Sequence, residues 1–527
     1  MWRFLLTIVF MFTCTVALAK EPKSGGVLRI YQRDSPASAS LLEEATISAN
    51  VPFMAIFNNL ILFDQNKPTN SDQTIVPELA TAWAWSDDHL RLTFTLRDGV
   101  TWHDGKPFTA ADVKCTFALL RETGTDRLRR NPRKLWYANV AEVSTNGDRE
   151  VSLRLTRPQP SLLAMLASGD SPIYPCHVNA ARMRTNPIGT GPFKLAEFRQ
   201  NEVIRLVRNT NYWKPGHPYL DGIELPIITN RATAMLAFVA GKLDMTFPTE
   251  VTLPTLRDIK REAPRAICHF GPTNLSENVI INRERPPFND ADVRRAMALA
   301  IDRHAFASIL FEGQADTGSV LLPTPSGIWG MPEEMKRTLL GFDPDVAKNR
   351  TEARAIMERR GYGPQKRIPV KVSIRNLAVY RDPAIILIDH LKEIYIDGEL
   401  DPIETSLWFP KLARKDYVIG LNITANAIDD PDQAFYENFA CGSERNYSQY
   451  CNPELEKKFD LQSAEFDLAK RRLLVWDIDR NLHDDVARPI ILHMHGGTCW
   501  QPRVQGYVPM VNSSLNGYRF EDVWLDQ

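Results

Sequence analysis

The sequence predicts a mixed α/β fold, because stretches with the period of a strand and stretches with the period of a helix interleave without strict alternation. Residues 90–96 alternate apolar and polar side chains, which is typical of a half-buried strand. Residues 289–301 begin with Asn289-Asp290 and repeat apolar side chains at helical spacing. At about 100–200 residues per domain, the 527 residues predict about three domains or one large two-lobed body.

The first elements after the N-terminal segment are a strand, a turn and a helix. Val27–Ile30 is expected to form a strand, and Asp104-Gly105 is a turn dipeptide. Thr109 and Asp112 have the spacing of a capping box, which predicts that a helix begins there. Residues 93–112 form a strand, a turn and a capped helix on this interpretation, and nothing in them needs to contact a ligand. Trp102 is therefore expected to pack in the core and not to stack on a ligand.

The later elements are bounded by glycines or by acidic and amide caps. Strands are expected at residues 151–155 and 370–374, and also after residues 189–193 and 220–225. Helices are expected at residues 232–240, 351–360 and, for the most part, 461–482. The sequence contains no internal repeat and no low-complexity tract.

The N-terminus has the parts of a cleavable export signal. Arg3 precedes an apolar run from Phe4 to Val16, and Ala17-Leu18-Ala19 is a small-x-small tripeptide. The run is shorter than the roughly 20 apolar residues that span a bilayer. Residues 1–19 are therefore predicted to be removed, and the mature chain is expected to work outside the cytoplasm. The residues before Cys14 are Met11-Phe12-Thr13, not the leucine and small residues that lipoprotein processing prefers, so a lipid anchor at Cys14 is not expected.

Charge composition argues against a nucleic-acid binder. Lysine plus arginine total 63 and aspartate plus glutamate total 64, whereas nucleic-acid affinity depends on clustered basic charge. The longest basic cluster, Arg127–Lys134, is short and interrupted by proline, and it is expected to be a solvated surface.

Six cysteines remain after residue 19, and none forms a CxxC pair, so a zinc ribbon or thioredoxin-like site is not expected. Cys441 and Cys451 flank a short polar stretch, and an oxidising compartment favours a local disulfide between them. The partners of the other four cysteines stay open: Cys115, Cys176, Cys268 and Cys499.

Several motifs occur in a fixed order along the chain: Pro77–Ala80, Trp85–Asp88, Leu92–Val113, Gly189–Phe193, Pro286–Asp290 and Ala300–Arg303. Together they resemble the family 5 extracellular solute-binding proteins, the peptide, nickel and opine group that serves ABC importers. The likeness extends from about residue 25 to about residue 510, nearly the whole mature chain.

The resemblance implies an α/β, two-lobed periplasmic binding protein of class II, cluster C type, with an extra inserted domain. The expected boundaries are residues 20–55, 190–270 and 495–527 for the first lobe, 56–189 for the inserted domain and 271–494 for the second lobe. Two chain crossings are expected near Gly271-Pro272 and Gly496-Gly497, where glycine tolerates hinge motion. A ligand would lie in the cleft and be enclosed by closure.

The resemblance also suggests which residues hold the ligand. Dipeptide binders of the family place an Asp shortly before an Asp-Pro-Asp turn, here residues 430–432. The corresponding position is Ala427, which cannot pair with an ammonium group, and Asp429 is a candidate substitute. This departure argues against a plain dipeptide ligand.

The arginine that would bind a ligand carboxylate is expected after the strand at residues 370–374. Arg375 is the first candidate and Arg381 the second. Trp408 matches an aromatic residue that can face the cleft in the family, and Ser38 is a weaker candidate. For each arginine a surface ion pair, and for Trp408 a core position, remain open alternatives.

The predicted function is therefore that of a periplasmic substrate-binding subunit for oligopeptides or peptide-like solutes, monomeric, without cofactor or enzymatic activity. Its partner would be the importer's inner-membrane permease. One alternative is a secreted metal-assisted hydrolase, because His493-Met494-His495 could supply two imidazole ligands. However, the sequence has no HExxH and no Gly-x-Ser-x-Gly motif. Within the fold, nickel, haem, opine and sugar-derivative carriers remain possible.

Overall fold

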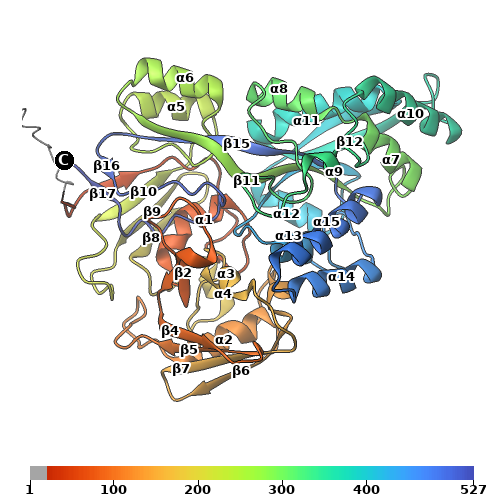
Figure 1. The fold of residues 1–527 in the computed structure, drawn as a ribbon. Coiled ribbons are helices and arrows are strands. Elements are labelled where there is room, and N and C mark those ends of the chain that lie inside the picture. Colours follow the sequence, from red (N-terminus) through yellow and green to blue (C-terminus); the bar gives the residue numbers. More distant parts are fainter. Residues whose placement is uncertain (1–20) are drawn as a thin grey trace, which may run out of the picture.

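The computed structural model describes residues 21–527, so the predicted signal at residues 1–19 lies outside the described part. Three β-sheets of four or five strands organise this part of the chain (Figure 1). Helices cover these sheets, and the predicted mixed α/β class is confirmed. Between residues 21 and 527, every helix is too short or too polar to span a bilayer.

We call the unit built on the sheet β1-β10-β9-β8 the first lobe. Its strands are β1 (Val27–Arg29), β8 (Phe193–Arg199), β9 (Val203–Arg208) and β10 (Gly222–Pro226). Strand β1 pairs in parallel with β10, so a strand near residue 28 joins a sheet whose other strands lie far along the sequence. The lobe also contains α1 (Ile47–Phe53), α5 (Arg231–Val239), α6 (Leu253–Glu262), β16 (Val504–Gln505) and β17 (Trp524–Leu525).

The second lobe is built on the five-stranded sheet β13-β12-β14-β11-β15. Its strands are β11 (Ile267–Ile281), β12 (Ile368–Arg375), β13 (Ile396–Ile403), β14 (Ile419–Ala425) and β15 (Ile490–Trp500). Its helices are α7 (Ala291–Ala300), α8 (Arg303–Phe311), α9 (Glu333–Lys336), α10 (Val346–Arg359), α11 (Ala378–Lys392), α12 (Thr405–Ala413), α13 (Pro431–Asn438), α14 (Pro453–Ser463) and α15 (Leu468–Asp484).

Strands β11 and β15 connect the two lobes. They run side by side from the α5 and α6 side of the molecule into the second sheet (Figure 1). Gly271 lies opposite Gly496 in this pair, so the two glycine positions expected at the chain crossings are neighbours. Closer to the first lobe, Cys268 lies opposite Cys499, and the two form a disulfide.

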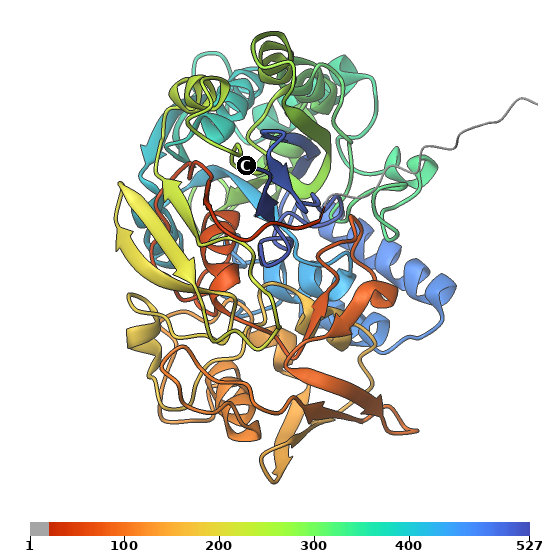
Figure 2. The same ribbon diagram turned by 90° about the vertical axis from the view of Figure 1, so that its left-hand side faces the viewer.

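The third unit is a sheet of order β4-β5-β7-β6, which lies beneath both lobes in the two views (Figure 1, Figure 2). It comprises β4 (Ala80–Trp85), β5 (Arg91–Leu96), β6 (Val140–Asn146), β7 (Glu150–Leu155) and α2 (Ala110–Leu120). The chain reaches it through β2 (Ile61–Phe63) and β3 (Ile75–Pro77) and leaves through α3 (Leu162–Ala167) and α4 (Ala180–Met183). We propose the boundaries expected from the sequence for these three units, with residues 56–189 as the inserted domain.

Helix α2 begins at the predicted capping box. The Thr109 backbone N–H donates to Asp112 Oδ2 at 2.9 Å, and the indole N–H of Trp102 reaches the same oxygen at 3.3 Å. The other carboxylate oxygen accepts the backbone N–H of Cys176 at 2.8 Å. Cys176 is disulfide-bonded to Cys115 of the helix, so one buried carboxylate joins a turn, a helix and a returning segment.

Asp112→Asn is expected to lower the free energy of unfolding by about 2 kcal/mol, because hydrogen bonds to a charged acceptor contribute more than neutral ones. Thermal or urea unfolding of the variant measures the loss. Asp98→Asn is the matched control, because the Asp98 side chain is 77% exposed and pairs only with an exposed arginine among the described residues. Equal losses in the two variants would contradict a special role for Asp112.

Residues 461–482 are mostly helical, as expected, and they belong to two helices, α14 and α15. The second helix begins where the Asp467 carboxylate accepts the backbone N–H groups of Ala469 and Lys470. One helix prediction was wrong in its limits. The helix expected at residues 351–360 begins earlier, at Val346, where Asp345 is the N-cap.

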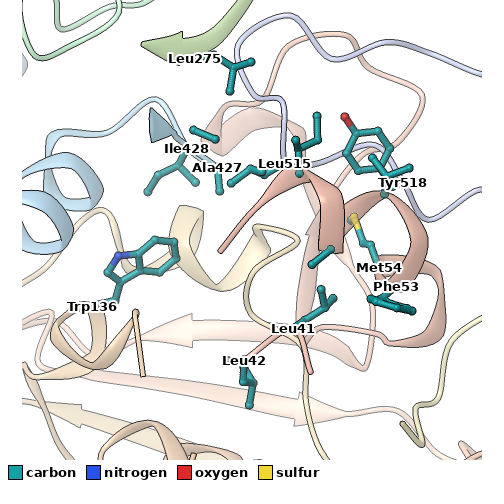
Figure 3. Packing of buried hydrophobic residues seen from close by; sticks show 14 of the residues in the cluster. Leu41, Leu42, Phe53, Met54, Trp136, Leu275, Ala427, Ile428, Leu515 and Tyr518 are labelled. Atoms are coloured by element: carbon teal, nitrogen blue, oxygen red, sulfur yellow. The ribbon is translucent and has the colours of Figure 1, made fainter. Parts of the chain in front are cut away.

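One apolar core runs through all the units. Figure 3 shows that Leu42 and Phe53 of the first lobe, Trp136 of the inserted domain and Ile428 of the second lobe lie around a common interior. Leu515 and Tyr518 of the C-terminal segment complete it. The two lobes and the inserted domain therefore pack against one another around the cavities described next.

Candidate ligand-binding site

Two adjoining cavities lie between the lobes and the inserted domain. The large cavity has a volume of about 570 Å³, and its walls come from residues 43–45, 129–132, 409–415 and 442–451. The inner pocket is much smaller, about 30 Å³. Both are lined by Ala45, Phe409, Arg445 and Tyr447, so they are neighbours that share a wall.

The inner pocket lies between the two lobes. Arg33 and Thr249 line it from the first lobe, and Arg375 and Asn422 line it from the second. Arg375 is the last residue of β12, and Asn422 is in the middle of the neighbouring strand β14. The end of one strand and the middle of the parallel strand beside it therefore present polar groups to the cleft.

Arg375 is buried and makes an ion pair across the cleft. Its guanidinium binds the Asp34 carboxylate of the first lobe and donates to Tyr380 Oη at 2.9 Å and to Thr405 Oγ1 at 3.2 Å. Burial alone would raise the pKa of Asp34, but Arg375, Arg33 and two hydroxyl donors outweigh it and lower that pKa. Asp34 is therefore held as a carboxylate between the lobes.

The ion pair belongs to a row of alternating charges. Arg33 donates to Glu250 at 2.7 Å and lies 3.7 Å from Asp34, and Arg231 reaches the other oxygen of Glu250 at 3.2 Å. Burial favours a raised pKa for Glu250, but the two arginines hold it below its usual value. Arg375 is the member of this row that comes from the second lobe, and Thr405 Oγ1 of the same lobe also donates to Asp34, at 3.0 Å.

The prediction that Arg375 faces the cleft agrees with its place on the inner pocket wall, but its charge already has a partner. The contact with Asp34 satisfies one amino group, and only Nε lacks a hydrogen bond among the described residues. A ligand carboxylate would have to share this guanidinium with Asp34. The role of Arg375 as a ligand contact stays a prediction.

Trp408 does not face either cavity. Its side chain is fully buried in a cluster with Ile280, Leu412, Tyr417 and Tyr447. The expectation of a ligand contact is corrected to the core alternative, because one face of α12 packs Trp408 and Leu412 against the sheet while Phe409 lines both cavities.

The other predicted ligand residues also lie off the cavity walls. Arg381 is half exposed, and its nearest carboxylate is the adjacent Asp382 at 3.6 Å. Asp429 accepts the backbone N–H of Ile328 at 3.0 Å, and burial raises its pKa to about 7. Ser38 lies behind the wall of the large cavity and donates to Glu44 Oε1 at 2.9 Å. None of the three lines the large cavity or the inner pocket.

Ala427, which stands where dipeptide binders of the family have an acid, is buried away from both cavities. Ala427 is fully buried, and its backbone N–H donates to Gln433 Oε1 at 2.8 Å. Asp430, in the following turn, is paired with Arg471 at 2.7 and 2.8 Å. The polar groups of Ala427 and Asp430 are therefore bonded within the second lobe.

The basic cluster of residues 127–134 is not simply a solvated surface, contrary to expectation. Arg129, Arg130 and Pro132 line the large cavity. Arg133 is fully buried and pairs with Asp170 at 2.7 Å. The sequence misled because positive charge near proline is common on surfaces, whereas here carboxylates from distant segments neutralise part of it.

Sequence reasoning also missed the charged residues of the large cavity. Glu43, Glu44, Lys415 and Glu444 line it, and no motif marks any of them. Glu43 is neutralised by Arg184 at 2.8 Å, and Arg445 by Glu437 at 2.6 Å. An even charge balance in the sequence therefore conceals a strongly charged site.

The histidines at residues 493 and 495 have separate protein partners. His493 is buried, its Nε2 lies 3.0 Å from the carbonyl oxygen of Ser319, and burial lowers its pKa to about 4. His495 Nε2 lies 3.0 Å from Asp316 Oδ2. Within residues 21–527 no group of three or more His, Cys, Asp and Glu side chains gathers in a way that could hold a metal ion.

The chain is similar to solute-binding proteins over almost its whole length. The probable di/tripeptide-binding protein 5 of Pseudomonas aeruginosa is 23% identical and covers 94% of this chain and 95% of its own. The periplasmic binding protein DppA of Helicobacter pylori, solved with the peptide STSA, superposes with a TM-score of 0.84 at 21% identity, covering 96% and 99% of the two chains. OppA of Haemophilus influenzae, solved with the peptide RPPGFSPFR, gives 0.84 at 19% identity over 96% and 100%.

These solved structures share the two-lobed fold expected from the sequence. Residues 74–446 match the family described as "Bacterial extracellular solute-binding proteins, family 5 Middle". This match covers more than half of the chain and includes most of the inserted domain and the strands β11, β12 and β14. The chain belongs to family 5 of the bacterial extracellular solute-binding proteins.

Proposed function

We propose that this protein is the periplasmic substrate-binding subunit of an ABC importer, exported with removal of residues 1–19, and that it captures peptides or peptide-like solutes without altering their bonds. The observation that supports this most directly is the pair of adjoining cavities between the lobes and the inserted domain. Its large cavity of about 570 Å³ falls within the range of small-ligand sites. The names of the relatives support a peptide or peptide-like ligand.

Closure about β11 and β15 would enclose the ligand, and a membrane permease would recognise the closed form. The paired Gly271 and Gly496 support a hinge at the crossing. A monomer is sufficient for this function, because both walls of the site come from one chain.

Purified residues 20–527 should unfold at a higher temperature in the presence of short peptides. At a hundredfold excess of peptide over Kd, binding should raise the free energy of unfolding by about 2.7 kcal/mol. Opines, sugars and nickel form the comparison panel. Ala45→Trp should abolish the effect, because Ala45 lines both cavities. Ala347→Trp, on an exposed position of α10, should retain it. Stabilisation by nickel alone, or recovery of a cleaved peptide, would contradict the proposal.

A further inference from the structure

One carboxylate on the wall of the large cavity has an unused oxygen. Glu44 follows β1 in the first lobe, and its side chain is only 4% exposed. Ser38 donates to Oε1 at 2.9 Å. No hydrogen bond reaches Oε2 from any residue between 21 and 527, and this oxygen is not sealed by protein atoms, so it faces the cavity that Glu44 lines.

The neighbouring arginines balance this carboxylate only in part. Arg129 Nη2 lies 3.7 Å from Oε1, which is an ion pair without a hydrogen bond, and water weakens it because the Arg129 side chain is 46% exposed. Arg130 lies with its guanidinium 5.9 Å from the centre of the Phe409 ring. Burial raises the pKa of Glu44 in spite of the Ser38 hydroxyl and both arginines.

The other acids and bases of the wall differ from Glu44. Glu43 is neutralised by Arg184, and Glu444 accepts the backbone N–H of Asn131 at 3.0 Å. On the opposite wall, Lys415 donates to the carbonyl oxygen of Asn446 at 3.3 Å. Glu44 is thus a deeply buried acid of the cavity to which no cation donates a hydrogen bond among the described residues, and a buried carboxylate of this kind is stabilised by a paired, hydrogen-bonding cation.

We propose that Glu44 anchors a cationic group of the ligand, an ammonium or a guanidinium, in the large cavity. This inference rests on the proposed function and adds the chemistry of the ligand. The cation donates to Oε2 while Ser38 keeps Oε1 and the carboxylate orientation fixed. The inserted domain takes part in recognition, because Arg129, Arg130 and Pro132 line the cavity beside this cation, and Glu43, another buried acid of the wall, is already paired with Arg184.

The test uses two pools of peptides from one protein digest, one untreated and one with all amines acetylated. Wild-type residues 20–527 are mixed with each pool, and the peptides retained after gel filtration are identified by mass spectrometry. We expect retention from the untreated pool and at least tenfold less from the acetylated pool. Retention of arginine-containing peptides from the acetylated pool would identify the cation as a guanidinium, and loss of all peptides would identify an amine.

Glu44→Gln keeps the shape of the side chain and an acceptor for Ser38, so it should fold and still lose at least tenfold in affinity for the best retained peptide by calorimetry. Glu334→Gln, at an exposed position without a hydrogen bond from the described residues, is the matched control and should bind normally. Equal affinity in the Glu44 variant, or equal retention from both pools of peptides that contain no arginine, overturns this inference and leaves peptide binding intact. Retention from neither pool overturns the proposed function, and this inference with it.

Discussion

Asp34→Ala is expected to shift the ligand-free protein toward an arrangement with an open cleft. We call the arrangement in which Asp34 and Arg375 pair between the lobes the closed one. In the closed arrangement, the variant leaves Arg375 as a buried guanidinium whose remaining partners are neutral hydroxyls. Removal of one partner of a buried ion pair costs about 3–5 kcal/mol. Opening of the cleft returns Arg375 to water, so this cost acts on the closed arrangement alone. At 1.4 kcal/mol per tenfold, the ratio of open to closed molecules should rise by about a hundredfold or more.

Small-angle scattering of the ligand-free protein measures this shift as a larger radius of gyration. Asp382→Ala is the control, because Asp382 is half exposed and pairs only with the adjacent Arg381 among the described residues. The double variant Asp34→Ala/Arg375→Ala should be closer to the wild type than either single variant, since it removes both buried charges together. A scattering profile of Asp34→Ala identical to that of the wild type would contradict an interlobe role for this pair.

Local structure was largely predictable because it depends on neighbouring residues. The alternating pattern of residues 90–96 and the Thr109–Asp112 spacing each specify an element over a few positions, and both elements formed as expected. The glycines at the two chain crossings could also be located. That they lie opposite each other depends on the register of β11 against β15, which no local pattern encodes.

The site was much less predictable, because its contacts join segments that are distant in sequence. Arg375 could be identified at the end of a strand, but its partner Asp34 comes from the other lobe. Trp408 and Phe409 are adjacent, and only the packing of α12 decides which of them is buried and which lines the cavities. Glu44 has no motif at all, and its importance arises from a cavity formed by three units of the chain.

The second large effect expected concerns Glu277, a buried acid in the middle of β11. Its side chain is almost fully buried, Oε2 has no hydrogen-bond partner among the described residues, and burial raises its pKa to about 8. In the unfolded chain an ordinary glutamate ionises near pH 4.3. The folded protein therefore keeps a proton that the unfolded chain loses, and stability should fall as the pH rises from about 5 to 8.

The loss from this one group should be on the order of 3 kcal/mol across that range, at 1.36 kcal/mol for each unit of pKa difference. Glu277→Gln cannot ionise, so its unfolding free energy should lack this slope and should exceed that of the wild type at pH 8. Calorimetric unfolding at pH 5, 6.5 and 8 compares the two proteins, with Glu334→Gln as an exposed control that keeps the wild-type slope. All other titrating groups are shared, so the difference between the curves reports Glu277 alone. Parallel curves of unfolding free energy against pH for wild type and Glu277→Gln would contradict this prediction. They would show that the Glu277 carboxyl is ionised in the folded protein, as a buried charge within β11.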